Sequence, residues 1–217
     1  MEKRGFTIVE LSIVAAIIAA ISAIAFANFP KFNRELALRR EANKLALALR
    51  KSQSFALAVR EFHQIDATYK DDPSCSIPPV AYPPYGVSLS MNAEASPDVR
   101  NNKTYIIFGD TNCSSLSAIP ISGYDASPIN EQVETFNMAG EVQIASIFGY
   151  GTACSGGCSL TRADAVYQRP APTVVLIGLK GGTFVNLDNR IEINLTVPNQ
   201  NLTAKVVLRP TGQVSIE

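Results

Sequence analysis

The stretch Gly5-Phe6-Thr7-Ile8-Val9-Glu10-Leu11 leads into a long apolar run without charge, Leu11 to Phe29. The run is rich in alanine and isoleucine, and as a helix it would be roughly 28 Å long at about 1.5 Å per residue. That length is close to the ~30 Å hydrocarbon core of a bilayer, so the run predicts a membrane-spanning helix. Glu10 is a carboxylate at its front, where a charge is costly unless it lies near the interface, is protonated or finds a partner.

Two alternatives for this segment stay open. A cleaved export signal would use Lys3 and Arg4 as its charged start and Ala25-Phe26-Ala27 as its cleavage site. The apolar run is longer than the roughly 7–15 residues of a signal core, and Glu10 would lie inside that core. A plain membrane anchor with a carboxylate at its interfacial end is the second alternative.

The combination of a short charged leader, Gly5-Phe6, Glu10 and a long apolar helix resembles the processing site of type IV prepilins and type II secretion pseudopilins. The resemblance implies that a prepilin peptidase cuts after Gly5 and methylates the new amine of Phe6. It further implies that Glu10 of one subunit lies beside the amine of a neighbour in a filament. Two charges that are each costly in an apolar environment would then compensate one another.

The segment that follows the apolar run is basic. Residues 31–62 carry eight Lys and Arg against three Glu, whereas residues 63–217 carry nine basic and fourteen acidic residues. By the positive-inside rule, this flank would place the C-terminal part in the cytoplasm. The resemblance implies the opposite orientation, with only the leader in the cytoplasm, and long domains translocate with less regard to charge.

Residues 31–62 continue the helical pattern with an amphipathic stripe. Its members step by three and four residues: Leu38, Ala42, Leu45, Leu49, Ser52, Ala56 and Val59. The stripe predicts the second half of a long stem helix, packed on a globular head. Pro30 at the junction predicts a kink or local loosening.

Beyond Asp71-Asp72-Pro73, prolines and turn residues separate short β-rich runs, and no helix of comparable length reappears. The predicted strands are 85–89, 104–108, 133–136, 141–148, 173–179, 191–197, 205–208 and 213–216. Pro210-Thr211-Gly212 and Gly181-Gly182 are predicted hairpin turns. The expected fold class is therefore α+β, with a long N-terminal helix packed on a mostly antiparallel β head.

The tail from Val206 to Ile216 and the order of the strands resemble the H-type minor pseudopilins and the FimT-like minor pilins. Together the two resemblances imply a pilin-like division of the chain. Residues 1–5 would be the leader, 6–29 the membrane-spanning and filament-core helix, 30–62 the amphipathic stem, and 63–217 the head.

All four cysteines lie beyond the apolar helix, which in an exported domain favours disulfides. Cys154 and Cys158 can close a small loop whose glycines allow a tight turn, and Cys75 would then pair with Cys113. Four cysteines allow three pairings, so connectivity stays open. A zinc site is the alternative, although Cys75 and Cys113 do not form a second close pair.

Other candidate sites have weak signals. Residues 110–114 offer oxygens at alternate positions, as calcium loops do, but no acidic closing ligand follows, which favours a turn after a strand. His63 is the single histidine and has no evident catalytic partner, so neither an enzyme nor a cofactor is expected. The acidic head argues against nucleic acid as a partner.

The sequence therefore predicts a structural subunit, minor in role, of a type IV pilus or a type II secretion pseudopilus. Its partners would be prepilin peptidase, other pilin or pseudopilin subunits and the bacterial cytoplasmic membrane. The head would be extracytoplasmic before and after filament assembly. The alternative is a membrane-anchored or secreted binding module that does not polymerise.

Overall fold

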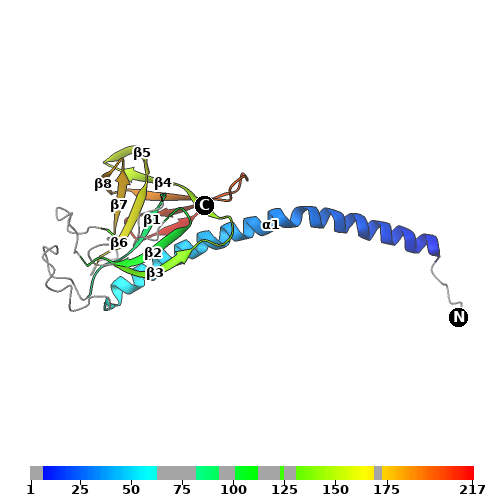
Figure 1. The fold of residues 1–217 in the computed structure, drawn as a ribbon, viewed down its shortest axis with the longest axis horizontal. Coiled ribbons are helices and arrows are strands. Elements are labelled where there is room, and N and C mark those ends of the chain that lie inside the picture. Colours follow the sequence, from blue (N-terminus) through cyan, green and yellow to red (C-terminus); the bar gives the residue numbers. More distant parts are fainter. Residues whose placement is uncertain (1–6, 63–81, 93–100, 112–122, 125–130, 169–172) are drawn as a thin grey trace. The chain divides into compact units, whose positions relative to one another are not determined.

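The computed structural model describes residues 7–62, 82–92, 101–111, 123–124, 131–168 and 173–217. These residues form one long helix, α1 (Ile8–Leu57), and strands in two sheets (Figure 1). The chain divides into two compact units, Met1–Ala37 and Leu38–Glu217. The strands are β1 (Tyr85–Ser90), β2 (Thr104–Gly109), β3 (Gln132–Asn137), β4 (Gln143–Gly151), β5 (Cys154–Leu160), β6 (Arg162–Tyr167), β7 (Val174–Lys180), β8 (Thr183–Leu187), β9 (Arg190–Thr196), β10 (Thr203–Leu208) and β11 (Val214–Ile216).

The second half of α1 packs on the head through the predicted stripe. Leu38, Ala42, Leu45, Leu49, Ser52 and Ala56 are all buried. Val59 is the exception: it is half exposed and lies beyond the end of the helix. Ring contacts and an ion pair place this half of α1 beside the sheet, because Phe55 meets Tyr85 edge-on and Lys51 pairs with Glu134 of β3. The helix is continuous through Pro30, and the predicted kink stays a prediction.

The helix ends earlier than predicted, at Leu57 instead of Phe62, in a Schellman motif. The Arg60 N–H donates to the Phe55 carbonyl at 3.3 Å, which is the bond that defines this cap. Val59 occupies the left-handed position at φ 54°, where glycine is usual. A β-branched side chain is strained in that conformation, so the residue types did not predict the end of α1 at this position.

We expect Val59→Gly to stabilise the protein by about 0.5–1 kcal/mol. The substitution relieves the left-handed strain of about 1–2 kcal/mol, and part of that gain is offset by the greater entropy of glycine in the unfolded chain. Urea unfolding of the full chain in detergent micelles, followed by circular dichroism, measures the change. Ala58→Gly, one residue earlier, is the control and should destabilise. A lower midpoint for Val59→Gly would contradict the strained cap.

The six-stranded sheet is antiparallel, with the order β3-β2-β1-β6-β7-β8. Every residue of β1 and β2 is buried, so both faces of these strands are covered. Tyr85 lies on the face toward α1. The opposite face carries an apolar cluster in which Tyr124 packs edge-on against Phe108. Burial on two faces explains why these strands are apolar without strict alternation.

The five-stranded sheet has the order β11-β10-β9-β4-β5 and is also antiparallel. Strand β9 alternates between buried and partly exposed residues, as its sequence predicted. Both predicted hairpin turns are confirmed. Gly181 and Gly182 join β7 to β8 with two positive φ angles, and Gly212, at φ 81°, lies in the turn between β10 and β11.

Eight predicted strands are confirmed within a few residues at each end, and three strands were not predicted. Strand β5 was expected to be only a small disulfide loop, because Ser and Gly have low β-propensity. Strand β6 contains Asp164, a charge that is nonetheless buried. Strand β8 is the partner that the Gly181-Gly182 turn implied without fixing its bounds. The coarse prediction of an α+β fold with antiparallel strands is correct.

Two buried tyrosines test the packing of the head. The hydroxyls of Tyr105 and Tyr167 have no hydrogen-bond partner among the described residues, and burial raises the pKa of both. We expect Tyr105→Phe and Tyr167→Phe each to stabilise by about 1 kcal/mol, because an unsatisfied buried hydroxyl is removed. Urea unfolding measures the change.

Tyr85→Phe is the matched control. The Tyr85 hydroxyl donates to the Arg60 carbonyl at 3.0 Å, so its removal should cost about 1 kcal/mol. Equal destabilisation by all three substitutions would show that the hydroxyls of Tyr105 and Tyr167 are satisfied in solution.

Candidate functional site

The first half of α1 exposes apolar side chains around its whole circumference. The unit Met1–Ala37 includes Ile8 at 85% exposure, and the other large exposed residues of this half are Val9, Leu11, Ile13, Val14, Ile17, Ile18, Ile21, Ile24, Phe26, Phe29, Phe32 and Leu36. Soluble proteins rarely leave a contiguous apolar surface of this extent in water. This surface therefore requires an apolar environment that the described part of the chain does not supply.

The same helix is long and apolar enough to cross a membrane. An 18-residue window within α1 meets the criteria of length and composition, and none of that window is buried. A buried core helix would also be apolar, but its window would be covered by protein. The observation fits the predicted membrane-spanning segment by length and composition only.

Glu10 lies in the first turn of α1 and takes part in a capping box with Thr7. The Thr7 hydroxyl accepts a hydrogen bond from the Glu10 N–H at 3.2 Å. In return, Glu10 Oε2 accepts from the Thr7 N–H and from the Thr7 hydroxyl, each at 3.4 Å. This reciprocal pattern is that of S/T-x-x-E, and it satisfies backbone donors that the start of a helix leaves unpaired.

This capping role of Glu10 was not predicted, although Thr7-Ile8-Val9-Glu10 carries its signal. The cap also fits electrostatically, because a carboxylate in the first turn is stabilised by the positive end of the helix dipole. Glu10 thus has a role within its own chain, which must be weighed against the predicted role between chains. Both Thr7 and Glu10 are exposed, so a second chain or a solvent molecule can reach the carboxylate.

The remaining predicted processing residues, Gly5 and Phe6, lie outside the described residues, as does His63. Cys154 and Cys158 form a disulfide, as predicted, with their Cα atoms 5.4 Å apart. It lies within β5, at a register shift between β4 and β5, so the glycine-containing segment forms a strand with a bulge instead of a free loop. Cys75 and Cys113 lie outside the described residues, and their pairing stays a prediction.

The region of the calcium alternative is described only at Asp110 and Thr111, both fully buried. The N–H and the hydroxyl of Thr111 donate to Glu131 Oε1 at 2.6 and 2.8 Å. These bonds tie the residues after β2 to Glu131, which directly precedes β3. Across the described ranges, no three His, Cys, Asp or Glu side chains come together in a way that could hold a metal ion.

Part of the basic surface of the stem is used within the head. Lys44 lies 3.1 Å from the buried carboxylate of Glu41, and Lys51 pairs with Glu134 while approaching the rings of Phe55 and Phe136. The guanidinium of Arg60 lies 4.1 Å from the centre of the Phe55 ring. Lys51 therefore joins α1 to β3, whereas Lys44 and Arg60 engage groups of the stem itself. All three are less available for lipid headgroups or acidic partners than the sequence implied.

The outer face of the five-stranded sheet carries a polar network. Arg190 lies over the Tyr150 ring at 3.9 Å, donates to Glu192 at 2.7 Å, and shares Glu192 with Lys205. Partial burial acts to raise the pKa of Glu192, but Arg190 and Lys205 lower it on balance. The network joins β4, β9 and β10 and contains no nucleophile, so its arrangement is that of cross-strand stabilisation.

Comparison of the chain with protein-family models, with curated proteins and with solved structures found no match. The residues themselves therefore carry the functional argument.

Besides Glu192, the carboxylate of Asp188 provides a test of the electrostatics of the head. Hydrogen bonds from the hydroxyl and the N–H of Thr152 lower the pKa of Asp188. A carboxyl whose pKa is lowered in the folded state stabilises the fold at pH values above its pKa in the unfolded chain. This contribution to stability is lost as the pH falls through the pKa of the folded state. We expect Thr152→Val to raise the pKa of Asp188 in a carbon-detected NMR titration and to weaken the acid dependence of stability.

Thr161→Val is the control for that titration. The Thr161 hydroxyl donates to the Leu179 carbonyl at 3.2 Å and not to a carboxylate. Its removal should leave the Asp188 titration unchanged. An Asp188 pKa that is equal in wild type and Thr152→Val would rule out the assigned cause.

Proposed function

We propose that this protein is a pilin-like structural subunit, minor in role, of a bacterial type IV pilus or type II secretion pseudopilus. One observation carries the proposal: an exposed apolar helix begins with a single carboxylate, Glu10, and Gly5-Phe6 precede it behind a charged leader. The proposal takes prepilin peptidase as the processing enzyme, with cleavage after Gly5 and methylation of Phe6.

The exposed surface of α1 supports assembly through the helix. In the membrane, lipid would cover its isoleucine, valine and phenylalanine side chains. In a filament, the same side chains would be covered by helices of neighbouring subunits. Its many alanines allow helices to approach closely, which favours van der Waals packing where lipid gives no hydrophobic driving force.

The charges at the start of α1 support a defined register. An unpaired carboxylate at the centre of a bilayer costs about 2.5–3.5 kcal/mol by insertion scales, and less near an end. Cleavage before Phe6 would create a positive amine close to the height of Glu10. Pairing the amine of one subunit with Glu10 of the next would remove both costs at one relative position of the two helices.

The proposed location follows from the same orientation. The leader would stay in the cytoplasm, and the head would lie outside the cytoplasmic membrane before and after filament assembly. The Cys154–Cys158 disulfide supports an oxidising compartment for the head. The function proposed is structural and associative, with other pilin or pseudopilin subunits as partners.

The capping box favours a second candidate, a membrane-anchored binding module that does not polymerise. In such a protein, Glu10 would serve only to cap α1 at the membrane interface through Thr7. The two candidates differ in what they require of Glu10. Assembly requires its negative charge, whereas capping requires only a hydrogen-bond acceptor at its side-chain terminus.

We expect Glu10→Gln to abolish or strongly reduce incorporation into filaments in the native host. Glutamine keeps the acceptor of a capping box but has no charge to pair with an amine. Thr7→Ala is the complementary change: it removes the cap, worth about 1 kcal/mol, and keeps the charge, so incorporation should be largely retained. Immunoblotting of sheared filament fractions against whole-cell protein measures incorporation.

Mass spectrometry of the mature N-terminus is the control for processing. Wild type, Glu10→Gln and Thr7→Ala should all begin with methylated Phe6, and substitution of Gly5 should block cleavage. Normal incorporation of Glu10→Gln would refute charge pairing. An intact Met1 in wild type would favour the plain anchor, and a chain beginning at Asn28 would favour a secreted protein.

A further inference from the structure

Strand β11 forms one edge of the five-stranded sheet, and its pairing with β10 fixes which backbone groups point outward. Lys205 and Glu217 exchange both N–H···O=C bonds, at 2.9 and 2.8 Å, and the Arg209 N–H donates to the Gln213 carbonyl at 3.0 Å. In an antiparallel pair, such hydrogen-bonded positions alternate with positions whose backbone groups point away from the partner strand.

This alternation assigns the outward positions to Val214 and Ile216, which face Leu208 and Val206 across the ladder. Their N–H and C=O groups therefore point toward the open side of the sheet. No hydrogen bond of these groups to another backbone group occurs within the described ranges. An edge with such groups is a template for a further strand.

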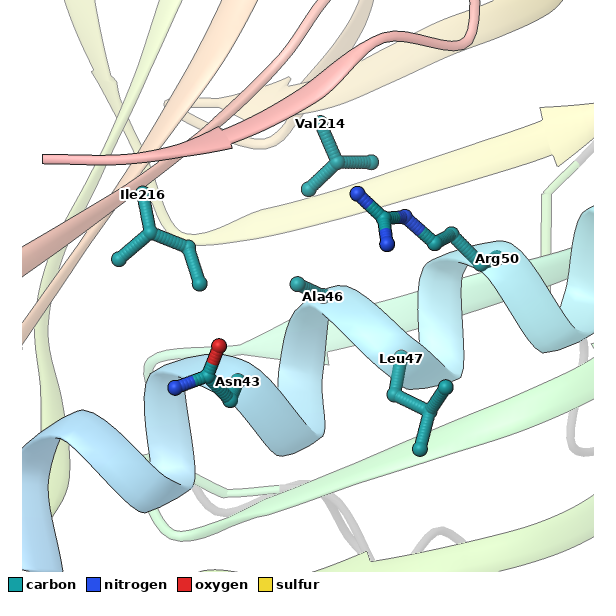
Figure 2. Close-up of a pocket in the computed structure, with 6 residues that line it drawn as sticks. All are labelled: Asn43, Ala46, Leu47, Arg50, Val214 and Ile216. Atoms are coloured by element: carbon teal, nitrogen blue, oxygen red, sulfur yellow. The ribbon is translucent and has the colours of Figure 1, made fainter.

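A groove of about 420 Å³ lies between this edge and α1. Its lining residues are Asn43, Ala46, Leu47, Arg50, Val214 and Ile216, all within the unit Leu38–Glu217 (Figure 2). Figure 2 shows the Val214 and Ile216 side chains pointing from β11 toward the helix, where Ala46 is too short to fill the space. Ile216 is 41% exposed and Leu47 is 65% exposed, so the groove is open. Its apolar lining comes from Ala46, Leu47, Val214 and Ile216, beside the polar side chains of Asn43 and Arg50.

The groove has one cation at its rim. Figure 2 shows the guanidinium of Arg50 reaching toward Val214. Among the described residues, Arg50 forms no ion pair or hydrogen bond, in contrast to Lys44 and Lys51 on the same helix. The groove therefore combines three features: outward backbone groups, an apolar floor and an unpaired positive charge.

We propose that this groove binds an extended segment of another polypeptide, which adds to β11 as a further strand. Alternate side chains of the added strand would point into the groove, so its apolar residues would recur at every second position. A carboxylate on that same face would lie beside Arg50. The partner is thus an extended peptide with alternating apolar residues and an Asp or Glu among them.

Two other occupants fit the groove less well. Pairing of two β11 strands from two copies of this chain would bring two Arg50 side chains toward one groove, with like charges close together. A lipid headgroup could meet Arg50, but it would not supply the alternating acceptors and donors with which a strand pairs the N–H and C=O groups of Val214 and Ile216. The proposal does not depend on filament assembly.

The test uses the full chain in nanodiscs of zwitterionic lipid, at one copy per disc. A phage-displayed library of random eight-residue peptides is selected on wild type and counter-selected on Ile216→Pro. Proline removes the outward N–H of Ile216 and leaves the hydrogen bonds of Glu217 and Ser215 to β10 in place. We expect enriched peptides that alternate apolar and polar residues, with Asp or Glu on the apolar face.

The enriched peptides are then synthesised and their affinities measured by fluorescence anisotropy. Arg50→Glu should weaken binding by about tenfold or more, since an attraction becomes a repulsion, and Arg50→Lys should retain most of it. Ile216→Ala keeps the N–H and loses side-chain contact, so Ile216→Pro should bind more weakly than Ile216→Ala. Slow exchange of the Lys205 and Glu217 amides in each variant shows that β11 is still paired.

Three outcomes would overturn the proposal. Peptides that bind Arg50→Glu and Ile216→Pro as tightly as wild type would place the binding elsewhere. Association between discs that Ile216→Pro abolishes, without any enriched peptide, would identify a second copy as the occupant. Binding to phosphatidylserine vesicles that requires Arg50, again without an enriched peptide, would identify a lipid surface.

Discussion

The apolar surface of the first half of α1 is the constraint on which the rest of this protein depends. A helix that is apolar all round is stable only where lipid or other protein covers it. In α1, residues such as Ile8 and Ile21 remain largely exposed, and the membrane-length window has no burial at all. The cover must therefore come from outside the described chain, as lipid or the helices of other proteins would supply it.

The surroundings of α1 change near residue 38, where its side chains begin to pack in the head. From Leu38 onward most of its apolar residues lie on one buried face, while Leu47 and Leu57 remain exposed. Two polar residues, Glu41 and Ser52, are buried on the packed side as well. Glu41 is buried beside Lys44, and the Ser52 hydroxyl donates to the Leu49 carbonyl at 2.9 Å. One continuous element thus combines a surface for an apolar environment with a surface for a protein core. This change in periodicity was readable from the sequence, because helical spacing alone decides it.

Other parts of the fold could not be predicted from local pattern. Strand β6 has no strong strand signal, and the charge of Asp164 argues against burial, yet Ser88 and Arg162 satisfy it from β1 and from β6 itself. Ser88 reaches Asp164 only through the pairing of β1 with β6, which no local pattern reveals. The groove beside β11 was likewise invisible, because it exists only where Ala46 happens to lie opposite Val214 and Ile216.

The candidate site shows a different relation between sequence and structure. The T-x-x-E pattern of Thr7 and Glu10 was present in the sequence, but the processing motif that overlaps it assigned Glu10 a different role. The capping of α1 by Glu10 is physically compatible with the proposed pairing, because both bonds from Thr7 reach Oε2, and Oε1 accepts none from a described residue. A carboxylate can accept several hydrogen bonds, so Oε1 can meet an amine from another chain while Oε2 remains in the cap. The cap would then restrict the rotamers of Glu10 before assembly, and less side-chain entropy would be lost when the pair forms.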